Sequence, residues 1–403
     1  MKVTVVCFGN ISSKNELAAL AFYNYSLVTY LFEKRLLDKV YCLDYDETVA
    51  IPASSIRRFS GTLFSKASYL ISILLEKTPL NFTSRLIMEK AFDQFVSFQE
   101  NFSKSTLLLN IKGINLALYK VAKKKQIPVV ILADTSHPVF IYNLVKKLEK
   151  LYNCKDNSSY TNKPRIKHLC KAYEQADLVI PMIGAEFIIN SFAANNITPN
   201  KVAPLKNLFG VDVSTFKPKI YHPGNQLQPI TFFTVNQAGL KKGLLPLIDA
   251  YSLLDPQEQK NSQLLIAGSI DSCAMSYIST ARTNGTIKYV GYLKKVFEGY
   301  QSADVFISAS IEDLGPRTVL EAMAAGLPVI VSKGCGVADW IEPGVEGFIY
   351  DPFNVKELTK LLQWMIANPG EAREMGKRAR SKVLCFSDQI YNAEIVSVLE
   401  SIQ

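Results

Sequence analysis

The sequence predicts an α/β protein in which buried parallel strands alternate with helices. Ten short runs are almost continuously apolar and rich in Val, Ile, Leu and Phe, which is typical of parallel strands covered on both faces. Stretches with helical spacing of their apolar residues lie between them, as in βαβ units. The chain has 403 residues, 48% of them hydrophobic, and is long enough for two domains that each have a core.

The expected strands form two groups of five. The weakest strand signal lies between the groups at residues 216–229, where three prolines predict a linker between two α/β domains. Helices are expected at 115–126, 244–259 and 355–383. The expected strands cover residues 2–8, 39–45, 106–111, 127–134, 176–182, 229–235, 262–268, 287–293, 304–310 and 328–332.

Residues 54–104 fit this alternation badly. Their stretch SSIRRFSGTLFSKASYLISILLEK is basic and aromatic, with helical spacing of its apolar residues. Such a helix either packs inward or lies on a membrane surface. We favour packing, because a buried helix explains the same apolar stripe. The membrane alternative gives Arg57, Arg58 and Lys66 a role in binding anionic lipid.

Several classes of protein are disfavoured by composition. No apolar run reaches the length of a membrane-spanning helix, and the start MKVTVVCFGN reads as a buried strand rather than a signal peptide, so a cytoplasmic location is expected. The seven cysteines include no close pair of the zinc or redox type and are expected to be mostly buried small hydrophobes.

Charge is distributed unequally along the chain. Residues 1–220 hold 29 Lys and Arg against 17 Asp and Glu, whereas residues 221–403 hold 16 against 19. A basic first half can meet nucleic acid, anionic lipid or an acidic substrate. No nucleic-acid-binding signature accompanies it, so nucleic acid is not an expected partner.

The stretch IEDLGPRTVLEAMAAGLPVIVS contains the most informative helix. Pro316 begins it and Gly326 follows its end, in the usual positions for these residues. Arg317, Thr318 and Glu321 then share one face. Free N–H groups and the positive helix end favour a phosphate there, and Glu321 can accept hydrogen bonds from a ribose. A solvated polar face explains the same pattern equally well.

A second strand, turn and helix precede this stretch in the sequence. Gly239 lies in the turn that follows the strand 229–235, and the basic pair Lys241-Lys242 comes directly before the helix. A lysine in such a turn can reach a phosphate as a point charge. Taken alone, a turn of this kind is common and mostly structural.

These two segments, in this order and with LLIAGS and IKYVGYL between them, resemble the retaining glycosyltransferases of family 4, the glycosyl transferases of group 1. The resemblance covers residues 205–385. It includes GVDVSTFKP at 210–218 and GCGVADWIEPGVEGFIYDP at 334–352. AEFIINSFAANNITPNKV at 185–202 is similar to the family's last N-domain helix, while residues 1–130 match only in architecture.

The resemblance implies the GT-B fold, with two Rossmann-like domains facing each other across a cleft. Residues 1–209 would form the acceptor-binding domain and residues 210–385 the donor-binding domain. Residues 386–403 would form a helix that packs back on the first domain. A nucleotide-diphosphate sugar would be the co-substrate, with no other cofactor and no metal.

Donor-site residues follow from the resemblance position by position. Lys242 matches the lysine that binds the donor diphosphate, and the family's arginine five residues earlier falls on Gln237, which brings no charge. Arg317, Thr318 and the backbone N–H groups of Gly315 and Arg317, on either side of Pro316, would assist Lys242. The base would be held through the backbone at Tyr292 and Leu293, and Gly9 matches a loop that faces the donor.

The family's pair of acids is separated by seven residues. Asp313 and Glu321 have this spacing, and Glu321 falls on the acid that contacts the ribose. Glu312 takes the first position if one residue is inserted at Gly315-Pro316. We favour Glu312 as the acid that binds donor-sugar hydroxyls, although the sequence is compatible with Asp313.

His137 ends the strand 127–134, where ligands bind in α/β sheets, and resembles the family's cleft histidine. It would orient the sugar or the acceptor. The other two histidines are His168, in a helical stretch, and His222, in the linker. A histidine at such a position is often structural instead.

The implied activity is transfer of a sugar to a glycan or lipid-linked glycan with retention of configuration. An anionic membrane surface is a further candidate partner, which would make the protein peripheral at the membrane. Two alternatives remain. The chain is a non-catalytic nucleotide-sugar-binding subunit, or the triplet from Asp44 to Asp46 belongs to a metal-dependent transferase of another fold.

Overall fold

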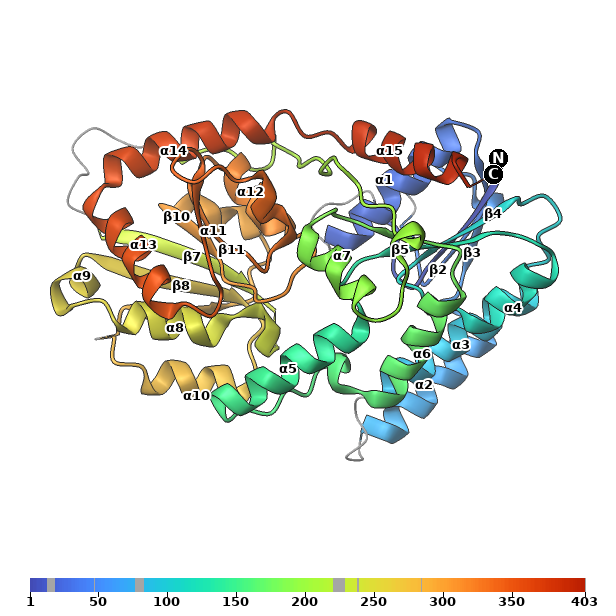
Figure 1. The fold of residues 1–403 in the computed structure, drawn as a ribbon, viewed down its shortest axis with the longest axis horizontal. Helices are drawn as coiled ribbons and strands as arrows, with labels where there is room; N and C mark the ends of the chain where they lie inside the picture. Colours follow the sequence, from blue (N-terminus) through green and yellow to red (C-terminus); the bar gives the residue numbers. More distant parts are fainter. Residues whose placement is uncertain are drawn as a thin grey trace. The chain divides into compact units, whose positions relative to one another are not determined.

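The computed structural model describes residues 1–12, 19–46, 48–76, 83–219, 229–237, 239–283 and 285–402. The chain divides into two units (Figure 1). Unit 1 comprises Met1–Asn143, Asn157–Asn207 and Asp388–Gln403, and unit 2 comprises Leu144–Asp156 and Leu208–Ser387. Most of the expected linker, including His222, lies outside the described residues.

Unit 1 contains a parallel sheet of six strands in the order β3-β2-β1-β4-β5-β6. All five strands expected in this half are present, and β1, β4 and β5 are buried along their whole length. The edge strand β3 was not expected, because it has only three residues and two are arginines. The strands are β1 (Val3–Cys7), β2 (Leu37–Cys42), β3 (Ile56–Arg58), β4 (Leu107–Ile111), β5 (Val129–Ala133) and β6 (Leu178–Pro181).

Unit 2 repeats this arrangement with the strand order β12-β11-β10-β7-β8-β9, again all parallel. In both sheets the first strand lies between the second and the fourth, which is the doubly wound order. The predicted α/β class with two such sheets is therefore confirmed; only β12 was missed here. The strands are β7 (Ile230–Asn236), β8 (Ser262–Gly268), β9 (Ile287–Gly291), β10 (Val305–Ser308), β11 (Val329–Ser332) and β12 (Gly347–Tyr350).

Helices cover both faces of each sheet (Figure 1). In unit 1, α1 contacts α15, and α3 contacts α4; in unit 2, α8 contacts α10 and α13, and α12 contacts α11 and α14. The helices are α1 (Ala19–Glu33), α2 (Leu63–Glu76), α3 (Thr83–Gln99), α4 (Leu116–Lys124), α5 (Pro138–Tyr152), α6 (Lys163–Gln175), α7 (Glu186–Ala193), α8 (Leu244–Ser252), α9 (Pro256–Lys260), α10 (Ser272–Thr280), α11 (Val296–Ser302), α12 (Arg317–Ala324), α13 (Val355–Ala367), α14 (Pro369–Val383) and α15 (Asp388–Glu400).

Proline and capping residues set several helix ends. The expected helix 244–259 is divided at Pro256, where Asp255 and Glu258 form a capping box that begins α9. The expected helix 355–383 is divided in the same way at Pro369, which begins α14. Both divisions follow from the cost of a proline inside a helix.

The C-terminal helix α15 belongs to unit 1. Its Tyr391 meets Tyr23 of α1 edge to face, with ring centroids 5.7 Å apart. The Tyr391 hydroxyl also donates to the carbonyl of Met182 at 2.7 Å, and Asn392 donates to Ser26. Aromatic packing and buried hydrogen bonds together fix this helix against unit 1.

A disulfide joins Cys154 to Cys273 within unit 2, with their Cα atoms 6.1 Å apart. This corrects the expectation for these two cysteines, whose separation of 119 residues gave no signal of pairing. The segment that carries Cys154 lies in unit 2 although its neighbours in sequence lie in unit 1. Cys7, Cys42 and Cys335 are buried thiols, as expected.

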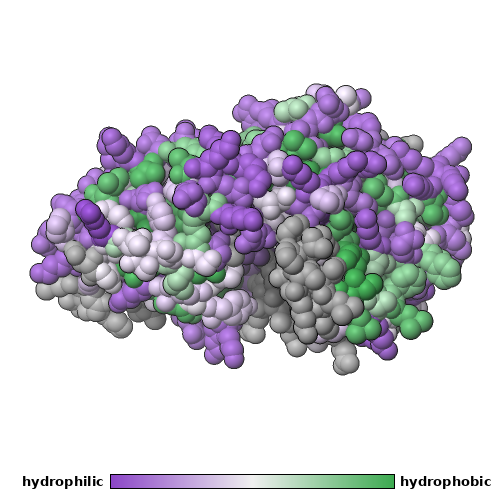
Figure 2. All heavy atoms as spheres, turned by 90° about the horizontal axis from the view of Figure 1, so that it is seen from below, coloured by the Kyte–Doolittle hydropathy of each residue, from purple (hydrophilic) through white to green (hydrophobic). Residues whose placement is uncertain are grey.

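Residues 54–104 form two helices that differ in burial. Phe92 and Phe95 of α3 are buried in the core of unit 1. The prediction of inward packing concerned the stretch 54–77, which contains α2. By contrast, α2 leaves a stripe of apolar side chains in solvent, and Figure 2 shows hydrophobic surface on the part of unit 1 that includes α2. No helix among the described residues is both long and apolar enough to cross a bilayer.

Candidate functional site

The candidate site lies at the carboxyl ends of β7 and β10, which are neighbours at the centre of the unit 2 sheet. Chain connections leave these two strands in opposite directions, and open α/β sheets bind their ligands in the crevice that results. Gln237 and the pair Lys241-Lys242 follow β7, while Glu312 and Asp313 follow β10. The topology therefore brings together the segments in which the sequence indicated a phosphate site.

The loop after β7 is held directly against the loop after β10. The N–H of Ile311 donates to the carbonyl of Lys241 at 2.7 Å. Gly243 has a φ of 69°, and a Cβ at this position would lie 1.8 Å from the carbonyl oxygen of Ala309. Only glycine permits this approach, which sets both lysines beside the end of β10.

A third loop, after β11, supports the acidic loop from its other side. The N–H of Asp313 donates to the carbonyl of Gly334 at 2.9 Å, and the carbonyl of Asp313 accepts from Gly336 at 2.8 Å. A Cβ on Gly334 would lie 2.1 Å from the carbonyl oxygen of Ile311. The segment from Ile311 to Asp313 is thus fixed by backbone contacts with two neighbouring loops.

Two consecutive lysine–acid pairs cross between the loops, and they differ in burial. Lys241 binds Glu312 at 2.5 Å, and the Glu312 side chain is 0% exposed. Lys242 pairs with Asp313, and about a fifth of each side chain reaches solvent. Glu312 is thus enclosed by its partner, while the Asp313 side chain reaches solvent. Which of the two acids binds the donor stays a prediction.

Asp313 is ionised at neutral pH. Burial alone raises the pKa of its carboxyl group, but Lys242, then Lys241, and hydrogen bonds from Lys242 and the N–H of Gly315 lower it below its usual value. The outcome is a fixed negative charge beside a fixed positive charge at the edge of the sheet.

Charged residues of α12 are buried instead of solvated. Arg317 and Glu321 are 7% and 8% exposed, and Thr318, between them, is half-buried. The hydroxyl of Tyr300 donates to Glu321 at 2.9 Å. Burial raises the pKa of Glu321, while Arg317 and Tyr300 oppose this shift. This burial excludes the alternative of a solvated polar face.

The remaining residues expected at the donor site lie at two strand ends. Gln237 is exposed directly after β7. Tyr292 follows the edge strand β9 and is 74% exposed, while Leu293 packs near Gly299. Tyr292 is therefore exposed and Leu293 is half-buried. Their roles stay predictions.

In unit 1, His137 is placed in the core rather than on an open surface. It is 3% exposed, and its ring lies 5.8 Å from those of both Tyr173 and Phe192. Burial lowers the pKa of His137 to about 4. The imidazole therefore packs against the rings of Tyr173 and Phe192 in the core. Gly9 follows β1, where a Cβ would lie 3.2 Å from the amide nitrogen of Asn24.

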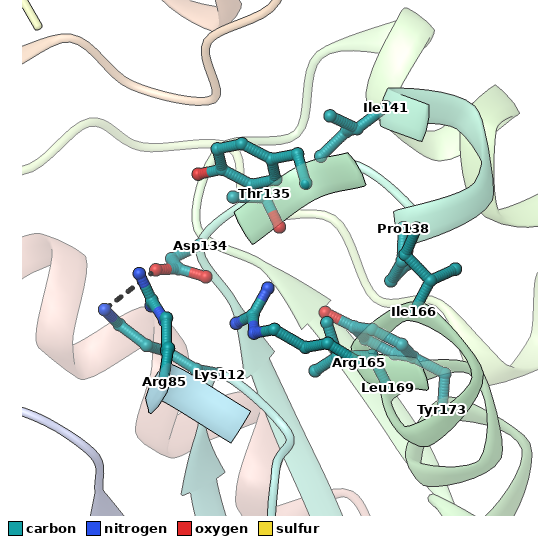
Figure 3. Close-up of a pocket in the computed structure, with 11 residues that line it drawn as sticks. Arg85, Lys112, Asp134, Thr135, Pro138, Ile141, Arg165, Ile166, Leu169 and Tyr173 are labelled. Atoms are coloured by element: carbon teal, nitrogen blue, oxygen red, sulfur yellow. Dashed lines mark ion pairs between the residues drawn. The ribbon is translucent and has the colours of Figure 1, made fainter. Parts of the chain in front are cut away.

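A cationic pocket at the carboxyl ends of β4 and β5 was missed (Figure 3). Lys112 and Asp134 directly follow these strands, and Arg85 and Arg165 come from α3 and α6. The strand-end positions of Lys112 and Asp134 were a usable signal. Arg85 and Arg165 carried none, because they lie on helices distant in sequence.

The triplet from Asp44 to Asp46 makes protein contacts. Asp44 pairs with Arg58 at 3.7 Å, and Asp46 accepts hydrogen bonds from the hydroxyls of Ser12 and Thr48. Across the described ranges, no group of three or more His, Cys, Asp or Glu residues is arranged to hold a metal ion.

Comparison with known proteins agrees with this geometry. Residues 219–382 match the family model of glycosyl transferases group 1. The alpha-monoglucosyldiacylglycerol synthase of Acholeplasma laidlawii is 24% identical over 288 residues, which cover 67% of this chain and 68% of that protein.

Solved structures match the chain over its whole length. The apo form of the lipopolysaccharide outer core galactosyltransferase WaaB superimposes with a TM-score of 0.64 at 17% identity, with 100% of both chains covered. Anabaena Alr3699/HepE in complex with UDP-glucose gives 0.63 at 16% identity, with 100% of both chains covered.

The chain has two Rossmann-like domains and matches these glycosyltransferase structures over its whole length. Its fold is therefore of the GT-B class. Residues 219–382, which lie in unit 2, match the glycosyl transferases of group 1. The relatives and solved structures similar to the chain as a whole are glycosyltransferases as well, which indicates a glycosyltransferase enzyme.

Gly243→Ala tests the approach of the two loops. We expect it to lower the free energy of unfolding by about 3 kcal/mol, because it adds a backbone clash to an unfavourable φ. Gly344→Ala is the matched control, since its φ is also positive, at 83°, but no atom lies within 4 Å of the added Cβ; it should cost only about 1 kcal/mol. Urea unfolding measures both, and equal losses would contradict the account of the loop contact.

His137→Gln tests the burial of the imidazole. Because the folded-state pKa of about 4 lies below the unfolded value of 6.5, the unfolded chain binds the extra proton first as pH falls. Between pH 7 and pH 5 the wild type should lose about 2 kcal/mol of stability from this group. The variant should lose that much less, because it lacks the group that takes up the proton. Urea unfolding curves at the two pH values measure this difference. An equal loss of stability between pH 7 and pH 5 in the wild type and in His137→Gln would disprove the burial of the imidazole.

Proposed function

We propose that the protein transfers a sugar from a nucleoside diphosphate sugar to a glycan or lipid-linked glycan, with retention of configuration and without a metal ion or other cofactor. The main support is the solvent-facing Lys242–Asp313 pair beside buried Arg317 and Glu321, at the carboxyl ends of β7 and β10. Charged groups held in this way are suited to a ligand that has both phosphates and hydroxyl groups.

Lys242 binds the donor diphosphate in this proposal. Its ammonium group is fixed by the loop contact at Gly243 and turned toward the site by Asp313. Arg317 adds a second positive charge at the start of α12, and Gln237 contributes a hydrogen bond without charge. Lys242 and Arg317 therefore carry most of the phosphate binding.

The two acids bind hydroxyl groups of the donor. Asp313 is ionised and accepts hydrogen bonds from the transferred sugar, whereas Glu321 accepts from the ribose with Tyr300 and Arg317 as its supports. Glu312 is a positioning residue that holds Lys241 and the loop. In this proposal the backbone at Tyr292 and Leu293 holds the base.

The reaction needs stabilised charge more than a protein nucleophile. The bond from the anomeric carbon to the diphosphate oxygen breaks, and a bond to the acceptor oxygen forms on the same face. The acceptor proton passes to the departing phosphate. Lys242 and Arg317 stabilise the negative charge that develops on the departing diphosphate. Holding the donor and the acceptor in the correct relative orientation supplies the rest of the rate acceleration.

Names of related proteins guide the choice of substrates. The synthase from Acholeplasma laidlawii is named for a glucosyldiacylglycerol lipid, and the Anabaena protein is described in complex with UDP-glucose. We therefore place a uridine nucleotide sugar first among the donors and a lipid-linked molecule first among the acceptors.

Peripheral membrane binding would bring the protein to such an acceptor. On α2 the side chains of Leu63 and Leu70 are 84% and 62% exposed, seven residues apart on one stripe, with Ile71 beside them. Exposed Arg58 and Lys66 lie near this stripe in sequence. An apolar stripe with flanking basic residues is the pattern of an interfacial helix.

Lys242→Ala tests the donor assignment. Loss of one preorganised charge should lower kcat about 100-fold, close to 3 kcal/mol of barrier. It should also remove the thermal stabilisation produced by the preferred sugar among UDP-, GDP-, ADP- and TDP-sugars, with EDTA making no difference. Lys260→Ala, on the exposed end of α9, is the control.

Near-normal turnover of Lys242→Ala would exclude that residue from the mechanism. Donor binding without any transfer by the wild type would favour the non-catalytic subunit, and loss of activity in EDTA would revive a metal-dependent reaction.

Leu63→Ser with Leu70→Ser tests the membrane role. We expect this double variant to bind vesicles of phosphatidylcholine with phosphatidylglycerol at least tenfold more weakly, since each substitution removes exposed apolar surface that the bilayer would cover. Replacing Arg57, Arg58 and Lys66 by Gln should weaken binding most at low salt. Leu253→Ser, at an exposed leucine of unit 2, is the control. Vesicle sedimentation measures all three, and unchanged binding would reject the role.

A further inference from the structure

The pocket at the carboxyl ends of β4 and β5 gathers three cationic side chains in unit 1. In Figure 3 the charged ends of Arg85, Lys112 and Arg165 lie together beside Asp134. The rest of the lining is largely apolar or aromatic. It comprises Thr135, Pro138, Ile141, Tyr160, Ile166, Leu169 and Tyr173.

A shared carboxylate orients the two arginines. Glu89 accepts from Nε and Nη2 of Arg165 at 2.8 to 3.0 Å and from Nε of Arg85 at 3.0 Å. The Nη1 atom of Arg165 makes no hydrogen bond with any residue that the structure describes. Arg165 is 6% exposed, so its guanidinium is fixed, with donors still available on its pocket side.

Lys112 reaches the pocket from a strained backbone. Its φ is 83°, in the left-handed region that non-glycine residues rarely adopt, and Gly113 follows with a φ of 64°. Its ammonium group lies 3.4 Å from Asp134, and both side chains are partly exposed. Strain of this kind is typical of functional positions, because a stable fold would place glycine there.

The charges in this pocket are not balanced. Three cations face two carboxylates, Glu89 and Asp134, and Glu89 is 0% exposed behind the arginines. Like charges gathered in a partly buried pocket repel one another unless an anion joins them. Three donor groups from three elements match the oxygens of a phosphoryl group, and the apolar wall suits whatever is attached to it.

We propose that this pocket binds a phosphoryl group of the acceptor substrate through Arg85, Lys112 and Arg165. The acceptor is then a phosphorylated molecule, either a lipid with a phosphate head group or a soluble sugar phosphate. That the bound molecule is the acceptor substrate rests on the proposed transferase function. Phosphate binding by the pocket does not depend on that function.

Binding of inorganic phosphate in a Lys242→Ala background tests the pocket, because that background weakens the phosphate site expected in unit 2. We expect Lys112→Gly to weaken phosphate binding at least tenfold and to raise the melting temperature, since glycine relaxes the backbone at this φ. Arg85→Gln, at a side chain that is 43% exposed, should weaken binding without lowering the melting temperature. Lys124→Gln, on the exposed end of α4, is the control.

Phosphate affinity unchanged in both Lys112→Gly and Arg85→Gln would overturn the proposal, whatever the melting temperatures. A structural lysine would instead lower the melting temperature and leave phosphate binding intact. Calorimetry with UDP-glucose on Lys112→Gly, with Lys242 in place, separates this outcome from failure of the donor site. Donor binding should equal that of the wild type even if the pocket proposal is wrong.

Competition against phosphate identifies the source of the group. Displacement by vesicles of phosphatidylcholine with phosphatidic acid, but not by phosphatidylcholine alone, assigns a lipid head group. Displacement by glucose 6-phosphate assigns a soluble sugar phosphate. If neither competes, the pocket holds only free phosphate, and the acceptor assignment is wrong.

Discussion

The site in unit 2 depends on the backbone contact between the loops that follow β7 and β10. Gly243 lets one loop approach the carbonyl of Ala309, and the hydrogen bond from Ile311 to Lys241 locks the approach. Two lysines and two acids meet only because of this contact. Most of the binding chemistry proposed for the donor follows from it, since the charges are in place before the ligand arrives.

The two neighbouring lysine–acid pairs of unit 2 have different roles. Lys241 and Glu312 are enclosed and hold the loops, while Lys242 and Asp313, one residue further along each loop, are partly open to solvent. Unit 1 shows a similar division, in which Glu89 forms a buried pair with Arg165 and also holds the more exposed Arg85. In both units a buried ion pair positions a second cation that a ligand can reach.

The parallel strands and the start of α12 were predictable, because apolar runs and a glycine-proline step are local signals. The difference in burial between Glu312 and Asp313 was not predictable, since it depends on which side chain a neighbouring loop encloses. Pairing of Cys154 with Cys273, and the approach of Arg85 and Arg165 to Lys112, also arise only in three dimensions. The exposed stripe of α2 was misjudged because its spacing is the same for a buried and a membrane-bound helix.

A crystal structure of the protein with its preferred nucleotide sugar would test the central claim most directly. We expect the ammonium group of Lys242 to contact a diphosphate oxygen and Asp313 to contact a hydroxyl of the transferred sugar. The Lys241–Glu312 pair should be unchanged. A donor bound away from Lys242, or contacted by Glu312 in place of Asp313, would contradict this claim.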